Sequence, residues 1–197
     1  DDGTRLTPAW NSEQKIESWF QNYAFSYGGY HFICLDLNSR KHAILGEKGS
    51  WPYADHLQWL SPLLAKVGIE NEKGAMPGAD LYEMPGGTFP WLREHFNAYP
   101  RRGERNMLIF AHQPLSKDPL NFGLMSFSPR EYQRMTTFLS AKDHRNSVGL
   151  WAAGHIHRNW EYNVKTWDMR KNICPGIETG AGFNGVMRLI TVWGAEQ

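Results

Sequence analysis

The histidines with the most informative spacing lie in Gly154-His155-Ile156-His157, where two imidazoles stand one residue apart behind small side chains. A helix would turn these side chains roughly 200° apart, and a strand would need extended pairing to hold them on one side. The spacing therefore favours a turn. Two imidazoles splayed by a turn can serve two different metal ions, because each neutral ring offers a nitrogen donor.

His112 is the third candidate ligand, because it directly follows the apolar run of residues 107–111. Residues 148–153 form another short apolar run, which ends just before Gly154, and both runs are typical of buried strands. Ligands gather at the carboxyl ends of strands in open α/β sheets, so the three imidazoles converge if these strands are neighbours. We therefore predict a transition-metal site at His112, His155 and His157.

The other five histidines are interpreted as structural, because they fall in a predicted strand interior, loops and helices with no partner at ligand spacing: His31, His42, His56, His95 and His144. Asp36, at a strand end, has two possible roles: it could orient a metal-bound imidazole, or it could cap a turn. Arg158 and Asn159 could contact a phosphate, although a solvent-facing arginine is the favoured interpretation.

The elements that must position these residues alternate between strands and helices. Residues 30–36 form a third apolar run after the turn signal Gly28-Gly29. Ser128-Pro129-Arg130-Glu131 predicts a helix start, since it is a capping box with proline at the first helical position, followed by an apolar stripe. A second helix is expected through residues 53–64, shortened or kinked by Pro62. This alternation predicts an α/β layered domain with at least part of its sheet parallel.

Two further stretches have weaker signals. Residues 68–105, with several glycines and prolines, are interpreted as a long surface excursion with a short helix near residues 91–96. After residue 160 we expect further strands in WEYNVKT, GIETGAG and MRLITVW. We find no internal repeat or interdomain linker, so residues 1–197 are interpreted as a single domain.

The composition limits the classes of function. With 197 residues and 41% hydrophobic content, the chain can bury one core without disulfides, and Cys34 and Cys174 are compatible with buried thiols or one bridge. The net charge of +1 and the lack of long like-charge runs give no basic patch for nucleic acid. No apolar stretch is long enough to span a bilayer. The first five residues lack a signal peptide, and without an initiator methionine we expect the start to lie upstream.

Four segments resemble, in the same order, the calcineurin-like metallophosphoesterases: YAFSYGGYHFICLDLNS, YADHLQWLSPLLAK, NMLIFAHQPL and WAAGHIHRNWEY. The most specific are the histidine in FAHQP and the Gly-His-x-His element. The resemblance implies a four-layer α-β-β-α sandwich with a binuclear centre of two divalent or trivalent transition-metal ions (Fe, Mn, Zn or Ni). It implies hydrolysis of phosphomonoesters or phosphodiesters, with His112 and His155 on one ion and His157 on the other.

The chain departs from that family in its acidic motifs. The family's Asp-x-His, Gly-Asp-x-x-Asp and Gly-Asn-His elements, which supply the remaining ligands, are absent from these 197 residues. We therefore expect the chain to be the C-terminal half of such a domain, with the N-terminal half as its partner and a phosphate ester as substrate. Neutral imidazoles cannot bridge two cations, because each donates one nitrogen and no negative charge. We expect the isolated chain to be inactive.

The residue pattern is also compatible with two other functions. A noncatalytic binding module that keeps the phosphoesterase fold would hold no metal at His155 and His157. A mononuclear zinc hydrolase would use these two residues together with His112, as three-histidine catalytic sites do, and would bind one Zn per chain. The metal content of the chain distinguishes these alternatives from a binuclear centre.

Overall fold

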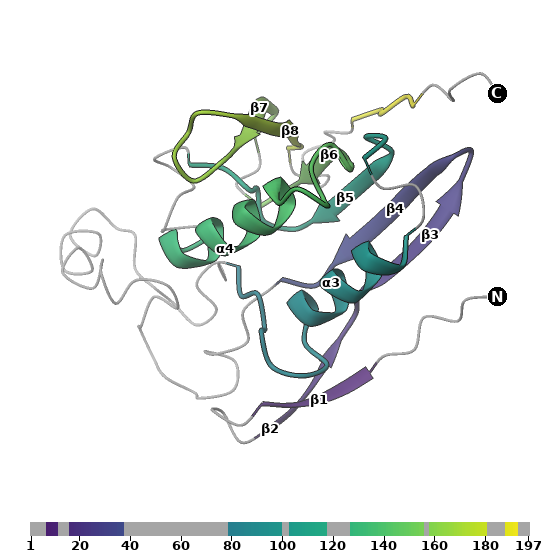
Figure 1. Ribbon diagram of the computed structural model, residues 1–197, viewed down its shortest axis with the longest axis vertical. Helices are drawn as coiled ribbons and strands as arrows, with labels where there is room; N and C mark the ends of the chain where they lie inside the picture. The colour runs from purple at the N-terminus through teal and green to yellow at the C-terminus, as the bar shows by residue number, and fades with distance from the viewer. Residues whose placement is uncertain are drawn as a thin grey trace.

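The computed structural model describes residues 7–11, 16–37, 79–99, 103–117, 127–155, 158–180 and 188–192. Within these ranges, two helices and eight strands follow one another along the chain (Figure 1). Their order is β1 (Thr7–Asn11), β2 (Ile16–Phe20), β3 (Tyr23–Tyr27), β4 (Tyr30–Leu35), α3 (Thr88–Ala98), β5 (Met107–Ala111), α4 (Pro129–Ser140), β6 (Val148–Ala153), β7 (Trp160–Lys165) and β8 (Asn172–Glu178).

Six of the strands form one mixed sheet in the order β3-β4-β5-β6-β8-β7, and β1 pairs with β2 in a separate antiparallel hairpin. β4, β5, β6 and β8 run parallel, whereas β3 and β7 are antiparallel strands at the two edges. The predicted α/β class with a partly parallel sheet is therefore confirmed. The strands β5 and β6 also have the bounds that the sequence predicts.

Both helices lie on the same face of the sheet (Figure 1). Phe138 of α4 contacts Phe89 and Phe96 of α3, with ring centroids 5.4 and 5.1 Å apart. On the sheet, Ile33 and Trp151 are fully buried. Because side chains alternate across a strand, Ile33, Ile109 and Trp151, which are paired across β4, β5 and β6, lie on one face of the sheet and belong to the same core as the helices.

α4 begins where its sequence predicts. The hydroxyl of Ser128 accepts a hydrogen bond from the Glu131 amide at 3.3 Å, and the Glu131 carboxylate accepts one from the Ser128 amide at 3.1 Å. Pro129 occupies the first turn, where a missing amide hydrogen costs nothing. From the predicted apolar stripe, Tyr132 and Leu139 are buried. This capping box satisfies backbone groups that a helix start would otherwise leave unpaired.

The opposite face of the sheet carries a row of partly exposed aromatic rings. Phe25 of β3 stacks on Phe32 of β4 at 4.8 Å between centroids, and Phe32 lies 6.2 Å from Phe110 of β5. Tyr23, Phe25 and Tyr27 are 42%, 44% and 79% exposed. Neither α3 nor α4 covers this face (Figure 1). A contiguous apolar row of this kind is typical of a surface that packs against another element.

The interpretation of residues 68–105 as a surface excursion is wrong for the described residues 79–99. Ala79, Leu81 and the apolar side of α3 belong to the main core, and α3 is longer than the predicted residues 91–96. One of the glycines that suggested a surface excursion, Gly87, has a packing role, because a Cβ there would overlap the carbonyl oxygen of Tyr82. The chain therefore turns tightly at Gly87 to bring α3 back onto the sheet.

Other sequence predictions have mixed outcomes. The strand in WEYNVKT is confirmed as β7, and β8 overlaps GIETGAG but begins earlier, at Asn172. Residues 188–192, inside MRLITVW, form no strand. The helix expected at residues 53–64 lies outside the described residues. In the ranges that the structure describes, no helix is long and apolar enough to cross a membrane.

Candidate metal centre

His112 and His155 meet at the carboxyl edge of the parallel strands. β5 and β6 are parallel neighbours, with Phe110 opposite Ala152, so the residues that follow the two strands emerge at the same edge. His112 directly follows β5, and His155 comes two residues after β6. The structure thus brings together two of the three predicted ligands, at the edge where α/β sheets commonly bind their ligands.

The two rings present nitrogen atoms to each other. Nδ1 of His155 lies 2.9 Å from Nε2 of His112, with the ring planes 83° apart. Two nitrogens at right angles on an ion with bonds of about 2.05 Å are about 2.9 Å apart, and tetrahedral ligands are about 3.3 Å apart. The pair therefore has the spacing of adjacent ligands on a five- or six-coordinate ion. The same distance suits a hydrogen bond from one ring to the other.

The backbone holds this arrangement in place. His155 has a φ of +81°, in the left-handed region that residues other than glycine rarely adopt. The Gly154 amide donates to the His112 carbonyl oxygen at 3.1 Å, and the Trp151 indole donates to the carbonyl oxygen of Gln113 at the same distance. Backbone strain of this kind clusters at functional sites, where the surrounding structure maintains it.

Solvent reaches the pair from one side. His155 is buried, with 4% of its surface exposed, whereas His112 is exposed. The buried ring is the one with the strained backbone, so its position is fixed by packing as well as by hydrogen bonds. An ion or a substrate would therefore approach from the side of His112.

His157, the third predicted ligand, lies outside the described residues. Among the residues that are described, no three His, Cys, Asp or Glu side chains lie close enough together to hold a metal ion. His112 and His155 thus supply two neutral nitrogen donors. A transition-metal ion takes four or more ligands, so further donors are needed to complete its coordination.

A buried ion pair adjoins this edge and was not predicted. Glu178, the last residue of β8, is fully buried, and its Oε2 lies 3.6 Å from Nε of Arg158. The Arg158 guanidinium also lies 3.9 Å from the ring centroid of Trp160. The Arg158 side chain is 31% exposed, but its Nε and Nη2 atoms are buried, so the expectation of a solvent-facing arginine is wrong for this part of the guanidinium. The sequence did contain a signal for this pair, namely the single carboxylate inside the predicted strand GIETGAG. Buried charges are almost always paired, so a carboxylate in a buried strand indicates a cationic partner elsewhere.

The loops that follow β6 and β8 are joined by a second contact next to the ion pair. The Gly180 amide donates a hydrogen bond to Oδ1 of Asn159 at 3.0 Å, so the Asn159 side chain has a structural role. The Thr179 amide donates to the Ala153 carbonyl oxygen at 2.9 Å. These bonds fix the backbone on either side of the Gly-His-x-His element.

His31 and His95 form a second imidazole pair, although neither has a partner at ligand spacing in the sequence, and their packing agrees with the interpretation of both as structural. Their Nε2 atoms are hydrogen-bonded, and Nδ1 of His31 lies 2.8 Å from the Ser26 hydroxyl. Tyr99 stacks on His31 at 4.2 Å. Burial, and then the neighbouring His95 ring, lower the pKa of His31 to about 4, and burial also lowers the pKa of His95. This neutral pair packs α3 against the amino end of β4, opposite the edge that holds His112.

Asp36 and the cysteines have structural roles. The Gln21 amide donates to Oδ2 of Asp36 at 3.1 Å, and the Asp36 amide donates to Oδ1 of Asn22 at 2.8 Å, so the turn-capping interpretation fits. Cys34 and Cys174 are free thiols, and the possible bridge is not formed. Burial raises the pKa of Cys174 to about 12, so its thiol stays protonated and unreactive.

The remaining histidines do not join either pair in the described ranges. His144 packs its ring against Phe138, at 4.3 Å between centroids, and its Nδ1 lies 3.0 Å from the Phe138 carbonyl oxygen. This agrees with its interpretation as structural. His42 and His56 lie outside the described residues.

Comparison with known proteins gives no relative for this chain. No family model matches it, and no characterised protein or solved structure shows significant similarity. The chain thus has an α/β fold with a mixed six-stranded sheet, and the histidine pair at its carboxyl edge is the feature that bears on function.

Proposed function

We propose that this chain supplies part of the binuclear metal centre of a metallophosphoesterase that hydrolyses phosphomonoester or phosphodiester bonds. The observation that supports the proposal is the 2.9 Å separation between Nδ1 of His155 and Nε2 of His112. These atoms come from adjacent parallel strands and lie at the edge where α/β sheets bind ligands. The family resemblance of the two histidine segments points to the same chemistry.

In this proposal His112 and His155 hold one ion and His157 holds the second. When bound, such ions supply Lewis acidity that stabilises charge on the phosphoryl oxygens and activates a water molecule. The chain's own part is to present two neutral ring nitrogens in a fixed orientation, because a protonated ring nitrogen has no lone pair to give to a metal ion. His155 does so from a buried position, and the exposed His112 leaves the phosphate ester access to the centre.

The aromatic face supports the second part of the proposal, which is the four-layer sandwich. Helices cover one face of the sheet, and the other carries the row of Phe25, Phe32 and Phe110. A second sheet packed about 10 Å away would bury this row. Its strand ends would reach the edge that carries His112. We propose that this sheet belongs to the N-terminal half of the domain and brings the carboxylates that bridge the two ions.

Metal binding by the purified chain tests the first part. The chain is equilibrated with Mn²⁺ or Zn²⁺, and bound metal is measured by elemental analysis and calorimetry. His155→Ala should weaken binding at least about tenfold, the effect expected for loss of a direct ligand or its orienting partner. His144→Ala, which removes a histidine outside the pair, is the matched control. Equal metal binding by both variants would contradict the proposal.

Catalysis is tested by restoring the missing donors. The N-terminal half of a calcineurin-like phosphoesterase, with its acidic motifs, is fused ahead of Tyr23, and hydrolysis of 4-nitrophenyl phosphate is measured with two metal equivalents. We expect activity in the fusion, none in the chain alone, and loss of activity on His112→Ala. Activity of the chain alone with one Zn would favour the mononuclear hydrolase. Absence of both metal binding and activity would favour the binding module.

A further inference from the structure

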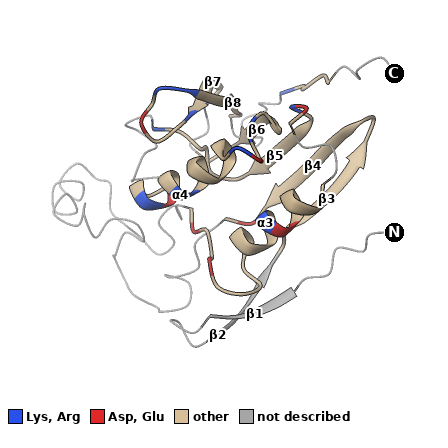
Figure 2. Cartoon of the chain, in the orientation of Figure 1, with Lys and Arg blue, Asp and Glu red and all other residues tan. Residues whose placement is uncertain are grey.

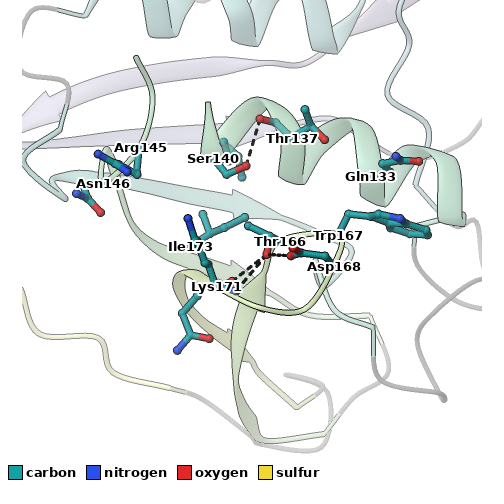
Figure 3. A pocket seen from close by; sticks show the side chains of 12 residues that line it. Gln133, Thr137, Ser140, Arg145, Asn146, Thr166, Trp167, Asp168, Lys171 and Ile173 are labelled. Atoms are coloured by element: carbon teal, nitrogen blue, oxygen red, sulfur yellow. Dashed lines mark hydrogen bonds between the residues drawn. The ribbon is translucent and has the colours of Figure 1, made fainter. Parts of the chain in front are cut away.

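A cavity of about 380 Å³ lies between α4 and the connection from β7 to β8 (Figure 3). None of the candidate metal ligands lines it. Its volume lies in the range of small-molecule sites. The buried side chains of Leu139 and Ile173 form its floor. Polar and aromatic residues line the rest, among them Thr137, Arg145, Asn146, Trp167, Asp168 and Lys171.

Two cations line this cavity without an anionic partner. In the described ranges, neither the Arg145 guanidinium nor the Lys171 ammonium makes an ion pair or a hydrogen bond. The cavity's one carboxylate is already engaged, because Asp168 accepts a hydrogen bond from Thr166 at 2.5 Å and pairs with Arg170 at 3.7 Å. Acidic and basic residues adjoin along this connection (Figure 2). The cavity therefore has an excess of positive charge.

We propose that this cavity binds an organic phosphate. A phosphate monoester carries a charge of about −2 at neutral pH, which matches the two unpaired cations Arg145 and Lys171. The hydroxyl of Thr137 and the amide of Asn146 line the same space and can hydrogen-bond the phosphoryl oxygens. The body of the ligand lies over the apolar floor, toward Trp167 at the other end (Figure 3). This site is separate from the proposed metal centre and does not depend on it.

The test uses phenylphosphonate, whose carbon–phosphorus bond a phosphoesterase does not cleave. It is titrated into the metal-free chain, and binding is followed through the amide signals of residues 166–173 and the indole signal of Trp167. Arg145→Gln and Lys171→Gln should each weaken binding about tenfold, as expected for loss of a charged hydrogen bond. Lys142→Gln is the matched control, since Lys142 is exposed near the same turn but does not line the cavity.

Each outcome bears on the proposal. Weaker binding of inorganic phosphate than of phenylphosphonate supports contact with the apolar floor, and equal binding would overturn the assignment of an organic ligand. Absence of binding, or equal weakening by Lys142→Gln, would overturn the site itself. Loss of binding in His112→Ala would assign the ligand to the metal centre instead. Because the chain is metal-free throughout, failure of the metallophosphoesterase proposal leaves these results unaffected.

Discussion

Acid should destabilise this fold through the buried pair of His31 and His95. Burial lowers the pKa of His31 from 6.5 to about 4, so the unfolded chain binds a proton at this residue more readily than the folded chain does. The stabilisation from the neutral ring is therefore complete above pH 6.5 and is lost as the pH falls toward 4. The His95 ring opposes the same protonation, because two adjacent imidazolium ions repel each other.

The size of the effect follows from the shift. At about 1.36 kcal/mol per pKa unit, the fall of the His31 pKa from 6.5 to about 4 is worth about 3 kcal/mol in full. Water can screen the ring from the side of Ser26, which is exposed, so we expect about 2 kcal/mol to be observed. Among the described residues, Ser26, Trp91 and Tyr99 contact the two rings, and none of these three is charged at neutral pH.

Urea unfolding of the wild type and of His31→Gln, followed by tryptophan fluorescence between about pH 7.5 and about pH 4, measures this contribution. Glutamine can replace the hydrogen bonds of His31 but does not titrate. The stability difference between the two proteins should therefore shrink by about 2 kcal/mol as the pH falls. Taking the difference cancels other titrating groups, and His144→Gln controls for removal of an unrelated histidine. A difference that stays constant with pH would refute the reasoning.

Three further substitutions test the packing of the same fold by urea unfolding. Burial raises the pKa of Glu131 to about 7 from 4.5, so its stability contribution is lost as the pH rises through 7, and Glu131→Gln should stabilise the chain by about 1 to 2 kcal/mol at about pH 8. An unchanged stability there would show that the carboxylate is well solvated. Ser128→Ala removes the capping bond and should cost about 1 kcal/mol at any pH. Gly149→Ala should cost about 2 kcal/mol or more, because its Cβ would overlap the Arg105 carbonyl oxygen, and a neutral result would contradict that close approach.

Elements with a local signal could be predicted from the sequence. The start of α4 depends on Ser128, Pro129 and Glu131, which act on one another within a single helical turn. β5 and β6 are short apolar runs between polar segments, and their parallel pairing follows from the helix between them. The meeting of His112 and His155 could be predicted for the same reason, since parallel neighbours end at one edge. The role of His157 stays a prediction.

Features that depend on distant partners could not be predicted. His31 and His95 are 64 residues apart, and nothing in either local sequence indicates that β4 and α3 place their rings in contact. β3 was not predicted from the sequence. Its aromatic side chains lie on the partly exposed face of the sheet, so their spacing does not follow the pattern of a buried strand. The burial of Glu178 likewise depends on Arg158, which arrives from a different loop.

The left-handed backbone at His155 helps to fix the two imidazoles that the proposed metal centre would use. Packing around His155 and the bond from the Gly154 amide to the His112 carbonyl oxygen hold the two ring nitrogens adjacent. In the proposed metal centre, ion binding would then require little ordering of these two side chains. In that centre, one metal would be exchanged for another from the side of the exposed His112 while β5 and β6 remain paired.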